Sequence, residues 1–421
     1  MSRSVVEVYA SWDPIEKPLL LGQLTYSDSS RGGVFSFAYD KAFLKSVYRL
    51  QIDPLLTLHS GELYNDAADK NFRAFLDSSP DRWGRILMQR RAAIEHRKGL
   101  RSSSRLSELD YLLGVHDSYR MGGIRFKTAN SPEFLDNNTE FSAPPMASLR
   151  ELEHAAIQIE KDENIESDEY YRWLNMLISP GSSLGGARPK ACVTDEHDQL
   201  WIAKFPNQND TFDVGAWEML CYELALAAGV EMSPSEIRKF SSQHHTFITK
   251  RFDRIGSKRL HLSSAMTQLQ YFNNKENDGE HSEGASYLEI AEFLTNRGAQ
   301  TKVDLAQLWR RIVFNIAVSN TDDHLRNHGF LLTSQGWKLS PAYDLNPIVG
   351  KQGLHLNITD TANGLDYNLA FEVIDFFRLT HAEATQIYDE VLSAVKNWQK
   401  AADRLGISRG QQLMKQAAFN V

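Results

Sequence analysis

The polar stretch Asn320–Asn327 reads NTDDHLRN and contains an Asp and an Asn that are five positions apart. Asp322 and Asn327 have the D-x-x-x-x-N spacing of loops that catalyse phosphoryl transfer. In such a loop the Asp orients a hydroxyl and accepts its proton, while the Asn carbonyl oxygen binds Mg²⁺. The spacing therefore predicts Asp322 as a general base and Asn327 as a metal ligand. A polar loop after a core helix is the alternative interpretation, and a transition-metal site using Asp323 and His324 is another.

A lysine interrupts the apolar, strand-like run Trp201–Phe205, which reads WIAKF. A cation in that position is typical of the V-A-I-K strand of protein kinases, where it holds phosphate oxygens. A charge in an apolar setting needs a carboxylate partner, and we expect Lys204 to pair with Glu218 on the next helix, which ends before Gly229. Glu223 on the same helix is the competing partner. An edge-strand lysine with its ammonium group in solvent is the alternative.

The stretch Gly181–Lys190, GSSLGGARPK, is rich in small residues. Small residues let backbone N–H groups approach phosphate oxygens closely, so the stretch predicts a loop that covers phosphates. It is not a Walker A loop, because Ala191 rather than Ser or Thr follows Lys190, and it lacks the G-x-G-x-x-G spacing. A flexible surface turn is the alternative interpretation.

A second carboxylate follows a predicted β-hairpin. Apolar runs at 330–332 and 337–339 flank a turn that contains Gly336, and the chain then reaches Tyr343 and Asp344. Protein kinases place their second Mg²⁺ ligand at this point along the chain, so position predicts Asp344 for that role. An ordinary turn residue is the alternative.

Composition narrows the class of protein. The 421 residues are 42% hydrophobic and 24% charged, which is typical of a folded chain of more than one domain. The formal charge of −8 excludes a global basic field that would attract nucleic acid. Two cysteines are too few for a disulfide framework, and no apolar run approaches the roughly 20 residues of a membrane span. These features, with a start that lacks a signal-peptide pattern, predict a cytoplasmic protein with no membrane contact.

Several motifs in order along the chain resemble the HipA family of serine/threonine kinases, the toxin halves of bacterial toxin–antitoxin pairs. The resemblance covers most of the chain. Its motifs are 110–115 (DYLLGV), 122–126 (GGIRF), 185–190 (GGARPK), 251–254 (RFDR), 286–288 (SYL) and the loop 322–327. The sequence departs from the family's usual Leu-Pro-Leu around Ile52–Leu56, which concerns partner contacts and not the kinase core.

The resemblance implies a role for each matching residue. Ser183 would be autophosphorylated, with Ser182 as the alternative acceptor, and Glu218 would orient Lys204. Lys250, Arg251 and Phe252 would form the hinge beside adenine, and Asp253 would lie near the ribose. Asp322 would be the catalytic base, and Asn327 and Asp344 would bind the metal. The residues implied to surround the nucleotide are Gly185, Gly186, Ala187, Arg188, Pro189, Lys190, Lys204, Lys250, Arg251, Phe252, Asp253, His324, Leu325, Arg326, Asn327, Tyr343 and Asp344.

The predicted fold class is α+β: a protein-kinase-like, two-lobed fold with a mixed N-lobe, an all-helical C-lobe and an appended β-rich N-terminal subdomain. We expect domains at 1–145, 146–255 (the ATP-binding lobe) and 256–421 (the catalytic lobe), the first boundary lying in the Asn-, Ser- and Pro-rich stretch 128–146. Within 71–98 the pattern is helical, and Pro80 must begin a new helix. From 181 to 254 the order is strand, turn, strand, helix, strand.

These expectations combine into one function. The chain would transfer the γ-phosphate of ATP to a protein Ser or Thr with the help of Mg²⁺. The resemblance implies a helix-turn-helix antitoxin, HipB-like, as partner, DNA contact through that antitoxin alone, and an aminoacyl-tRNA synthetase as substrate. Two alternatives stay open: a nucleotide-binding scaffold or co-repressor without catalysis, and a kinase-fold enzyme that transfers AMP.

Overall fold

The computed structural model describes residues 3–28, 33–65, 70–129, 131–135, 144–161, 167–178, 188–273, 280–281 and 284–421. The chain forms two compact units, each built from two stretches of sequence. Unit 1 comprises 1–203 and 253–281, and unit 2 comprises 204–252 and 282–421. The division into domains at 145 and 255 stays a prediction. Among the described helices, none combines the length and the apolar composition that a membrane span requires.

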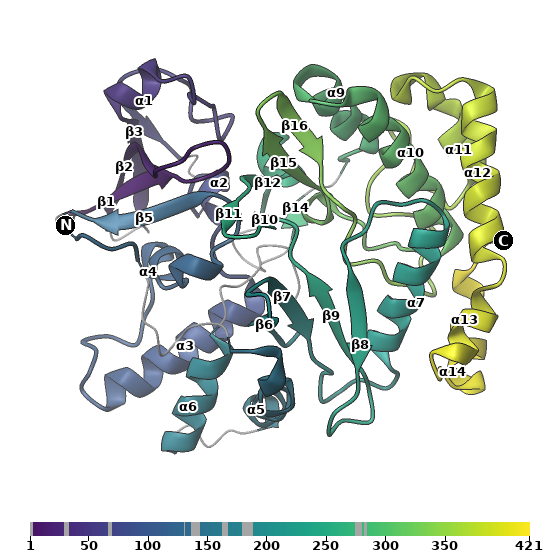
Figure 1. Cartoon of the computed structure of the whole chain (residues 1–421), viewed down its shortest axis with the longest axis horizontal. Helices are drawn as coiled ribbons and strands as arrows, with labels where there is room; N and C mark the ends of the chain where they lie inside the picture. Colours follow the sequence, from purple (N-terminus) through teal and green to yellow (C-terminus); the bar gives the residue numbers. More distant parts are fainter. Residues whose placement is uncertain are drawn as a thin grey trace. The chain divides into compact units, whose positions relative to one another are not determined.

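Unit 1 contains an antiparallel sheet of five strands in the order β4-β3-β2-β1-β5 (Figure 1). Its strands are β1 (Arg3–Ala10), β2 (Leu19–Ser27), β3 (Val34–Tyr39), β4 (Glu62–Tyr64) and β5 (Ile124–Thr128). Val6, Val8 and Ala10 alternate with less buried residues along β1, so one face of the strand enters the core. The β-rich start of the chain follows from this alternation.

Helices and short strands complete unit 1. The helix break predicted at Pro80 is present, since α2 ends at Leu76 and α3 begins after Asp81, whose carboxylate caps it. The helices are α1 (Lys41–Lys45), α2 (Arg73–Leu76), α3 (Arg82–Arg97), α4 (Glu108–Leu113), α5 (Leu149–Lys161), α6 (Asp168–Leu177) and α8 (Ala265–Gln268). The remaining strands are β6 (Lys190–Thr194), β7 (Leu200–Lys204, whose last residue belongs to unit 2), β10 (Arg254–Ile255), β11 (Lys258–Arg259), β12 (Leu262–Ser264), β13 (Phe272–Asn273) and β14 (Glu280–His281).

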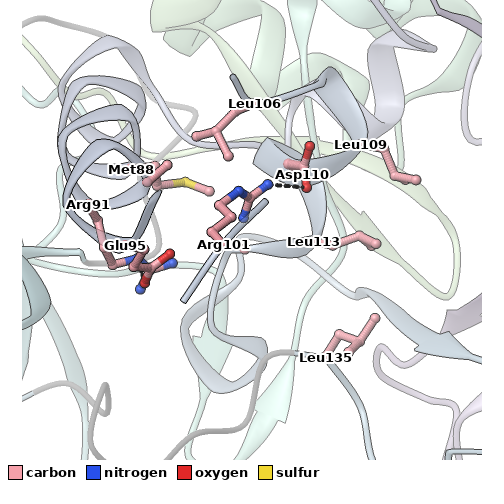
Figure 2. A pocket seen from close by; sticks show the side chains of 11 residues that line it. Met88, Arg91, Glu95, Arg101, Leu106, Leu109, Asp110, Leu113 and Leu135 are labelled. Atoms are coloured by element: carbon pink, nitrogen blue, oxygen red, sulfur yellow. Dashed lines mark hydrogen bonds and ion pairs between the residues drawn. The ribbon is translucent and has the colours of Figure 1, made fainter. Parts of the chain in front are cut away.

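A pocket of about 300 Å³ lies between α3 and α4 (Figure 2). Apolar side chains such as Met88 and Leu109 line it. Its charged residues pair with one another, Arg101 with Asp110 at 2.9 Å and Arg91 with Glu95 at 3.6 Å. The predicted catalytic and nucleotide-binding residues are not in its lining. This pocket therefore does not belong to the predicted active site.

Unit 2 is mainly helical. Strands β8 (Ser235–Arg238) and β9 (Thr246–Lys250) pair antiparallel, and β15 (Gly329–Thr333) with β16 (Gly336–Leu339) forms the predicted hairpin. The expectation of an all-helical C-lobe over 256–421 is wrong because of this hairpin, which brings the chain back from the loop 320–327. The helices are α7 (Val214–Ala227), α9 (Tyr287–Arg297), α10 (Thr301–Ala317), α11 (Tyr367–Glu372), α12 (His381–Val395), α13 (Trp398–Arg404) and α14 (Arg409–Lys415).

Helix α10 is the centre of the unit 2 core. Apolar residues at helical spacing, among them Leu305, Leu308, Ile312 and Ile316, are fully buried. Helices α9 and α12 pack against it (Figure 1). The helix ends at Ala317, and the polar segment 319–327 follows directly. A rigid buried helix thus fixes where the predicted catalytic loop begins.

Candidate active site

Lys204 lies at the centre of a cluster of three charged side chains in unit 2. Its Nζ donates to Glu218 Oε1 at 2.5 Å and to Asp344 Oδ1 at 2.6 Å. The three residues come from the end of β7, from α7 and from the segment after β16. Three residues far apart in sequence and predicted for one site therefore meet.

Burial and charge act in opposite directions on the Lys204 ammonium group. Its side chain is only 15% exposed, and this desolvation lowers its pKa, but the adjacent carboxylates of Asp344 and Glu218 raise it more. The net effect is a raised pKa, so Lys204 is a cation at neutral pH. A fixed cation beside two carboxylates can hold phosphate oxygens once one carboxylate turns to another partner.

Helix α7 positions Glu218. Asp213 caps the helix by accepting from Ala216 N at 3.1 Å, and Gly229, at φ 75°, follows the C-terminal residue Ala228. Glu218 is 5% exposed and lies four residues into the helix. The competing partner, Glu223, instead accepts a hydrogen bond from Arg404.

Asp344 has a left-handed backbone conformation, with φ 61°. Asp and Asn adopt this conformation more readily than most other non-glycine residues. The neighbouring Tyr343 hydroxyl donates to the backbone oxygen of Arg326 at 2.7 Å. The segment that carries Asp344 is therefore fastened to the predicted catalytic loop.

A buried hydrogen-bond network holds that loop. Asp323 Oδ2 accepts from Tyr287 Oη at 2.7 Å and from Asn315 Nδ2 at 2.6 Å, and it contacts His328 Nε2 at 2.9 Å. Burial raises the pKa of Asp323, but His328 and the hydrogen bonds outweigh it, so the net pKa is lowered and the carboxylate is charged. Asp323 is thus engaged with Tyr287, Asn315 and His328. Among the described residues, no cluster of three or more His, Cys, Asp or Glu side chains could hold a metal ion.

The fixed Asp323 leaves its neighbour Asp322 directed to solvent. Asp322 is exposed, and its backbone oxygen accepts from Asn327 Nδ2 at 3.1 Å. A short 3₁₀ turn, Leu325–Asn327, closes the loop. The His324 ring packs edge-on against His355, with ring centroids 5.7 Å apart. An exposed carboxylate on a rigid loop is what a base for an incoming hydroxyl requires.

Asn327 has an oxygen suited to a cation. Its Oδ1 is buried and has no hydrogen-bond partner within the described part of the chain. A buried acceptor without a donor is costly unless a ligand satisfies it. Together with the Asp344 carboxylate, this oxygen belongs to the hard donor class that Mg²⁺ prefers. The residues present therefore fit the predicted metal.

The predicted hinge residues follow β9. The Phe252 ring stacks on Tyr343 with centroids 5.6 Å apart, so the segment 250–252 contacts the segment that carries Asp344. Arg251 is 4% exposed, and Lys250 is the last residue of β9.

The predicted phosphate-covering loop falls mostly outside the described residues, and with it Ser182, Ser183, Gly185, Gly186 and Ala187. Arg188, Pro189 and Lys190 are described and belong to unit 1. The Lys190 side chain is buried and donates to Asp81 Oδ2 at 2.6 Å. Lys190 is predicted to contact the nucleotide through its backbone. The pairing of its side chain with Asp81 does not test that role.

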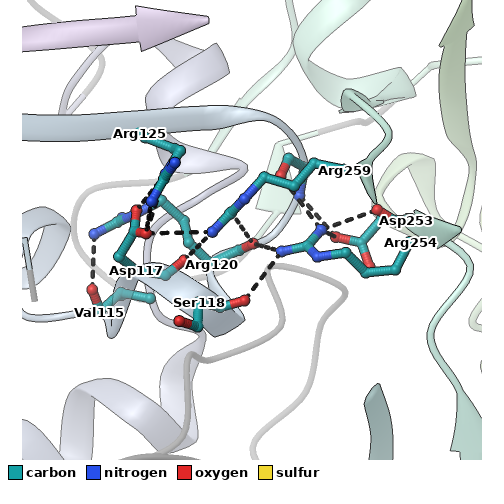
Figure 3. Close-up of polar contacts among 9 residues, drawn as sticks. Val115, Asp117, Ser118, Arg120, Arg125, Asp253, Arg254 and Arg259 are labelled. Carbon is teal, nitrogen blue, oxygen red and sulfur yellow. Dashed lines mark hydrogen bonds and ion pairs between the residues drawn. The ribbon is translucent and has the colours of Figure 1, made fainter. Parts of the chain in front are cut away.

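Asp253, predicted near the ribose, also lies in unit 1 and is fully buried. Its Oδ2 accepts from Gly122 N at 2.8 Å and from Arg254 Nη1 at 2.6 Å. Figure 3 shows that Arg254 pairs with Asp253 and reaches the backbone oxygen of Arg120, whereas Arg125 and Arg259 pair with Asp117. The contacts of the Asp253 carboxylate thus join two of the family motifs, 122–126 and 251–254. Its role beside a ribose stays a prediction.

Sequence reasoning missed the residues that position the loop. Tyr287 comes from α9, Asn315 from α10 and His328 from the position before β15, and only the fold brings them to Asp323. One signal was available in the sequence: Asn315 is the polar residue in the apolar run 312–318, which reads IVFNIAV.

The Lys204–Glu218 pair gives a testable prediction. Lys204→Met and Glu218→Gln should each lower kcat/KM for phosphate transfer, and the double variant should cost little more, because a pair in contact is coupled by roughly 0.5 to 3 kcal/mol. Steady-state kinetics of the four proteins give the coupling. Glu223→Gln is the matched control and should retain activity, because Glu223 pairs with Arg404. Additive losses would mean that the two side chains act separately.

Comparison with known proteins identifies a family. A family model described as a HipA-like C-terminal domain matches residues 182–399, which is more than half of the chain. A protein of Sinorhizobium fredii named "Putative kinase Y4mE" is 27% identical over 149 residues, 34% of this chain. The match spans 33% of the length of that relative.

A solved structure is similar over nearly the whole chain. It is the toxin–antitoxin system of Shewanella oneidensis, a complex of HipA, HipB and operator DNA. The likeness has a TM-score of 0.63 at 16% sequence identity and covers 98% of this chain and 94% of the other. At this identity the likeness shows a shared fold.

Proposed function

This chain belongs to the HipA-like family, and on that premise we propose that it is an ATP- and Mg²⁺-dependent serine/threonine protein kinase. The observation that carries the proposal is the contact of Lys204 with both Glu218 and Asp344. In kinase active sites, a carboxylate on a helix holds the lysine, and a second carboxylate, which follows the catalytic loop in the chain, lies beside it. The similarity to a protein named as a kinase supports it.

Each residue of the site has a task in this reaction. When bound, MgATP supplies the phosphoryl group, and the positive charge of its Mg²⁺ offsets the negative charge of the phosphates. Lys204 would donate to phosphate oxygens, and Asn327 Oδ1 and the Asp344 carboxylate would hold the metal. Asp322 orients the acceptor hydroxyl and takes its proton as the new oxygen–phosphorus bond forms and the bond to ADP breaks. Phe252 is proposed to contact adenine and Tyr343 to lie near the phosphates, and the stacking of their rings supports a shared site.

We also propose the biological setting. The fold is shared with a HipA that is solved with HipB and operator DNA, which supports a helix-turn-helix antitoxin as partner of this chain. The net charge of −8 supports contact with DNA through that partner. An aminoacyl-tRNA synthetase is the proposed class of substrate, which rests on the family alone.

The test is incubation of the purified chain with Mg²⁺-ATP, alone and with a bacterial cell extract, followed by mass spectrometry. Added phosphate on Ser or Thr, absent when ATP or Mg²⁺ is left out, is the expected result. Added AMP would mean that the chain transfers the nucleotide and is not a kinase. If neither the chain nor the extract is modified, the remaining proposal is a nucleotide-binding scaffold without catalysis. Asp322→Asn is the control that shows whether the label depends on this site.

We further predict that Ser183 is a switch, because a serine stands inside the stretch that should cover ATP. A phosphate there adds about 1.5 to 2 negative charges, which repel the nucleotide phosphates. ATP affinity should therefore fall in the phosphorylated protein, as calorimetry of the two forms would measure. Ser182→Ala is the control and should leave phosphorylation intact. Equal affinities would rule the switch out.

A further inference from the structure

The segment Arg409–Asn420 contacts three parts of unit 2 that adjoin proposed catalytic groups: helix α7, the segment after Asp344, and the turn before the catalytic loop. It follows the family match, which ends at residue 399. Helix α14 begins the segment, and a 3₁₀ turn, Gln416–Ala418, continues it to Phe419 and Asn420. None of the proposed catalytic residues lies in it.

The first contact is with α7. Gln411 Oε1 accepts from Trp217 Nε1 at 3.2 Å and from Asp213 N at 3.3 Å. Trp217 directly precedes Glu218, and its ring also contacts Phe419, with centroids 6.3 Å apart. The segment therefore holds the first turns of the helix that orients Lys204.

The second contact is with the segment after Asp344. Lys415 Nζ donates to the backbone oxygen of Pro347 at 2.6 Å. The adjacent Ile348 N donates to Ser319 O at 3.1 Å, and Asn346 N donates to Asn320 Oδ1 at 3.3 Å. Residues 346–348 are thereby tied to the start of the catalytic loop.

The third contact involves Asn420 and is with the end of α10 and Ser319, directly before the catalytic loop. Its backbone N–H donates to Ala317 O at 2.8 Å, and its Nδ2 donates to Ile316 O at 2.7 Å and to Ser319 Oγ at 3.0 Å. The last carbonyls of a helix lack partners within the helix. Asn420 satisfies that of Ala317 and adds a second donor to that of Ile316, which also accepts from Ser319 N at 3.3 Å. The side chain thus caps α10 where the chain leaves for Asp322.

The chain needs support at this point because of its backbone conformation. Ser319 has φ 49°, a left-handed conformation that a serine rarely adopts and that persists only where surrounding contacts hold it. Asn420 supplies such a contact through Ser319 Oγ. Asn420 is itself fixed, because Tyr367 Oη donates to its backbone oxygen at 2.6 Å and Phe419 stacks on Trp398 at 4.0 Å.

From these contacts we propose that Asn420 is a positioning residue for the catalytic loop, acting through Ser319 on Asp322. The inference rests on the proposed kinase function. The amide of Asn420 fixes the turn after α10, and the turn fixes the direction in which Asp322 meets the acceptor hydroxyl. Without that amide, the loop keeps its Asp323 network but loses the side-chain hydrogen bonds to Ile316 O and Ser319 Oγ that hold the turn before it.

The test compares Asn420→Ala with Gln412→Ala. Gln412 is a buried amide in the same segment, but it donates only to Asp403 at 2.7 Å and Ile407 O at 2.9 Å, away from the catalytic residues. It is therefore a matched control for lost packing and stability. The readouts are initial rates of labelled phosphate transfer from Mg²⁺-ATP to the chain itself, the KM for ATP, and the melting temperature.

Asn420→Ala should lower kcat by about 10- to 100-fold, because a small misplacement of a reacting group has effects of that size. The KM for ATP should change by no more than about twofold, since Lys204 and Asp344 are untouched. Gln412→Ala should lower the melting temperature and keep kcat. A wild-type kcat in Asn420→Ala, or equal losses of kcat in both variants, overturns the inference.

Ser319→Ala keeps the test decisive if Asn420→Ala does not fold. It removes the Oγ acceptor of the same hydrogen bond, so it should lower kcat in the same direction, and full activity would overturn the inference. A wild-type chain without any phosphate transfer would instead refute the proposed function, so the two failures are distinguishable.

Discussion

Asp322→Asn should reduce phosphate transfer by about 10²- to 10⁴-fold, the range that a general base contributes. An amide has nearly the shape of a carboxylate but cannot accept the proton of the acceptor hydroxyl. Asp322 is exposed, and it accepts hydrogen bonds from Asn327 Nδ2 and His324 N through its backbone oxygen, so the loop should keep its structure. ATP affinity should therefore be close to that of the wild type.

Two measurements decide the role of Asp322. Rapid-quench kinetics with labelled ATP gives the rate of transfer, and calorimetry with Mg²⁺-ATP gives the affinity. Asp360→Asn, an equivalent change at another exposed aspartate of unit 2, is the matched control and should be neutral. Transfer at the wild-type rate in Asp322→Asn would mean that another group is the base.

Asp344→Asn should weaken Mg²⁺-dependent ATP binding by at least about tenfold, since residues that only support metal ligands already change affinity by 10- to 100-fold. The variant removes a charged ligand and one partner of Lys204. Asn tolerates the left-handed conformation at φ 61° at least as well as Asp, so the backbone should not change. Transfer should fall with the affinity for the metal.

A Mg²⁺ titration of ATP binding in both proteins separates this role from a structural one. The difference in ATP affinity between Asp344→Asn and the wild type should become smaller as the Mg²⁺ concentration rises, because a higher concentration increases occupancy of a weakened metal site. Asp389→Asn, exposed on α12, is the control. An unchanged Mg²⁺-ATP affinity would remove Asp344 from the metal site.

Much of the local structure could be predicted from the sequence. Apolar alternation gave the strands at the start of the chain, Pro80 gave the break before α3, and the turn at Gly336 gave the β15–β16 hairpin. One strand was missed between 181 and 254, where two strands, β8 and β9, follow α7 in place of one. The reason is that β8, Ser235–Arg238, has no fully buried residue and so lacks the alternation that identifies a strand.

The site was predictable where chemistry sits in a local motif. Spacing placed Asp322 and Asn327 on one loop, and residue type placed a carboxylate opposite Lys204. Spacing could not show that Asp344 bonds the same ammonium group, because the pair is separated by 140 positions. It could not show Asn420 either, because a single amide beyond the 3₁₀ turn Gln416–Ala418 has no distinguishing pattern.

The contacts of the segment 409–420 have a consequence during protein synthesis. A ribosome makes residues 204–344, with every proposed catalytic group of unit 2, before it makes Gln411, Lys415 and Asn420. Until those three residues leave the exit tunnel, the nascent chain lacks the bonds that fix α7, Pro347 and Ser319. The proposed kinase should therefore reach its full rate only after Gln411, Lys415 and Asn420 have left the exit tunnel.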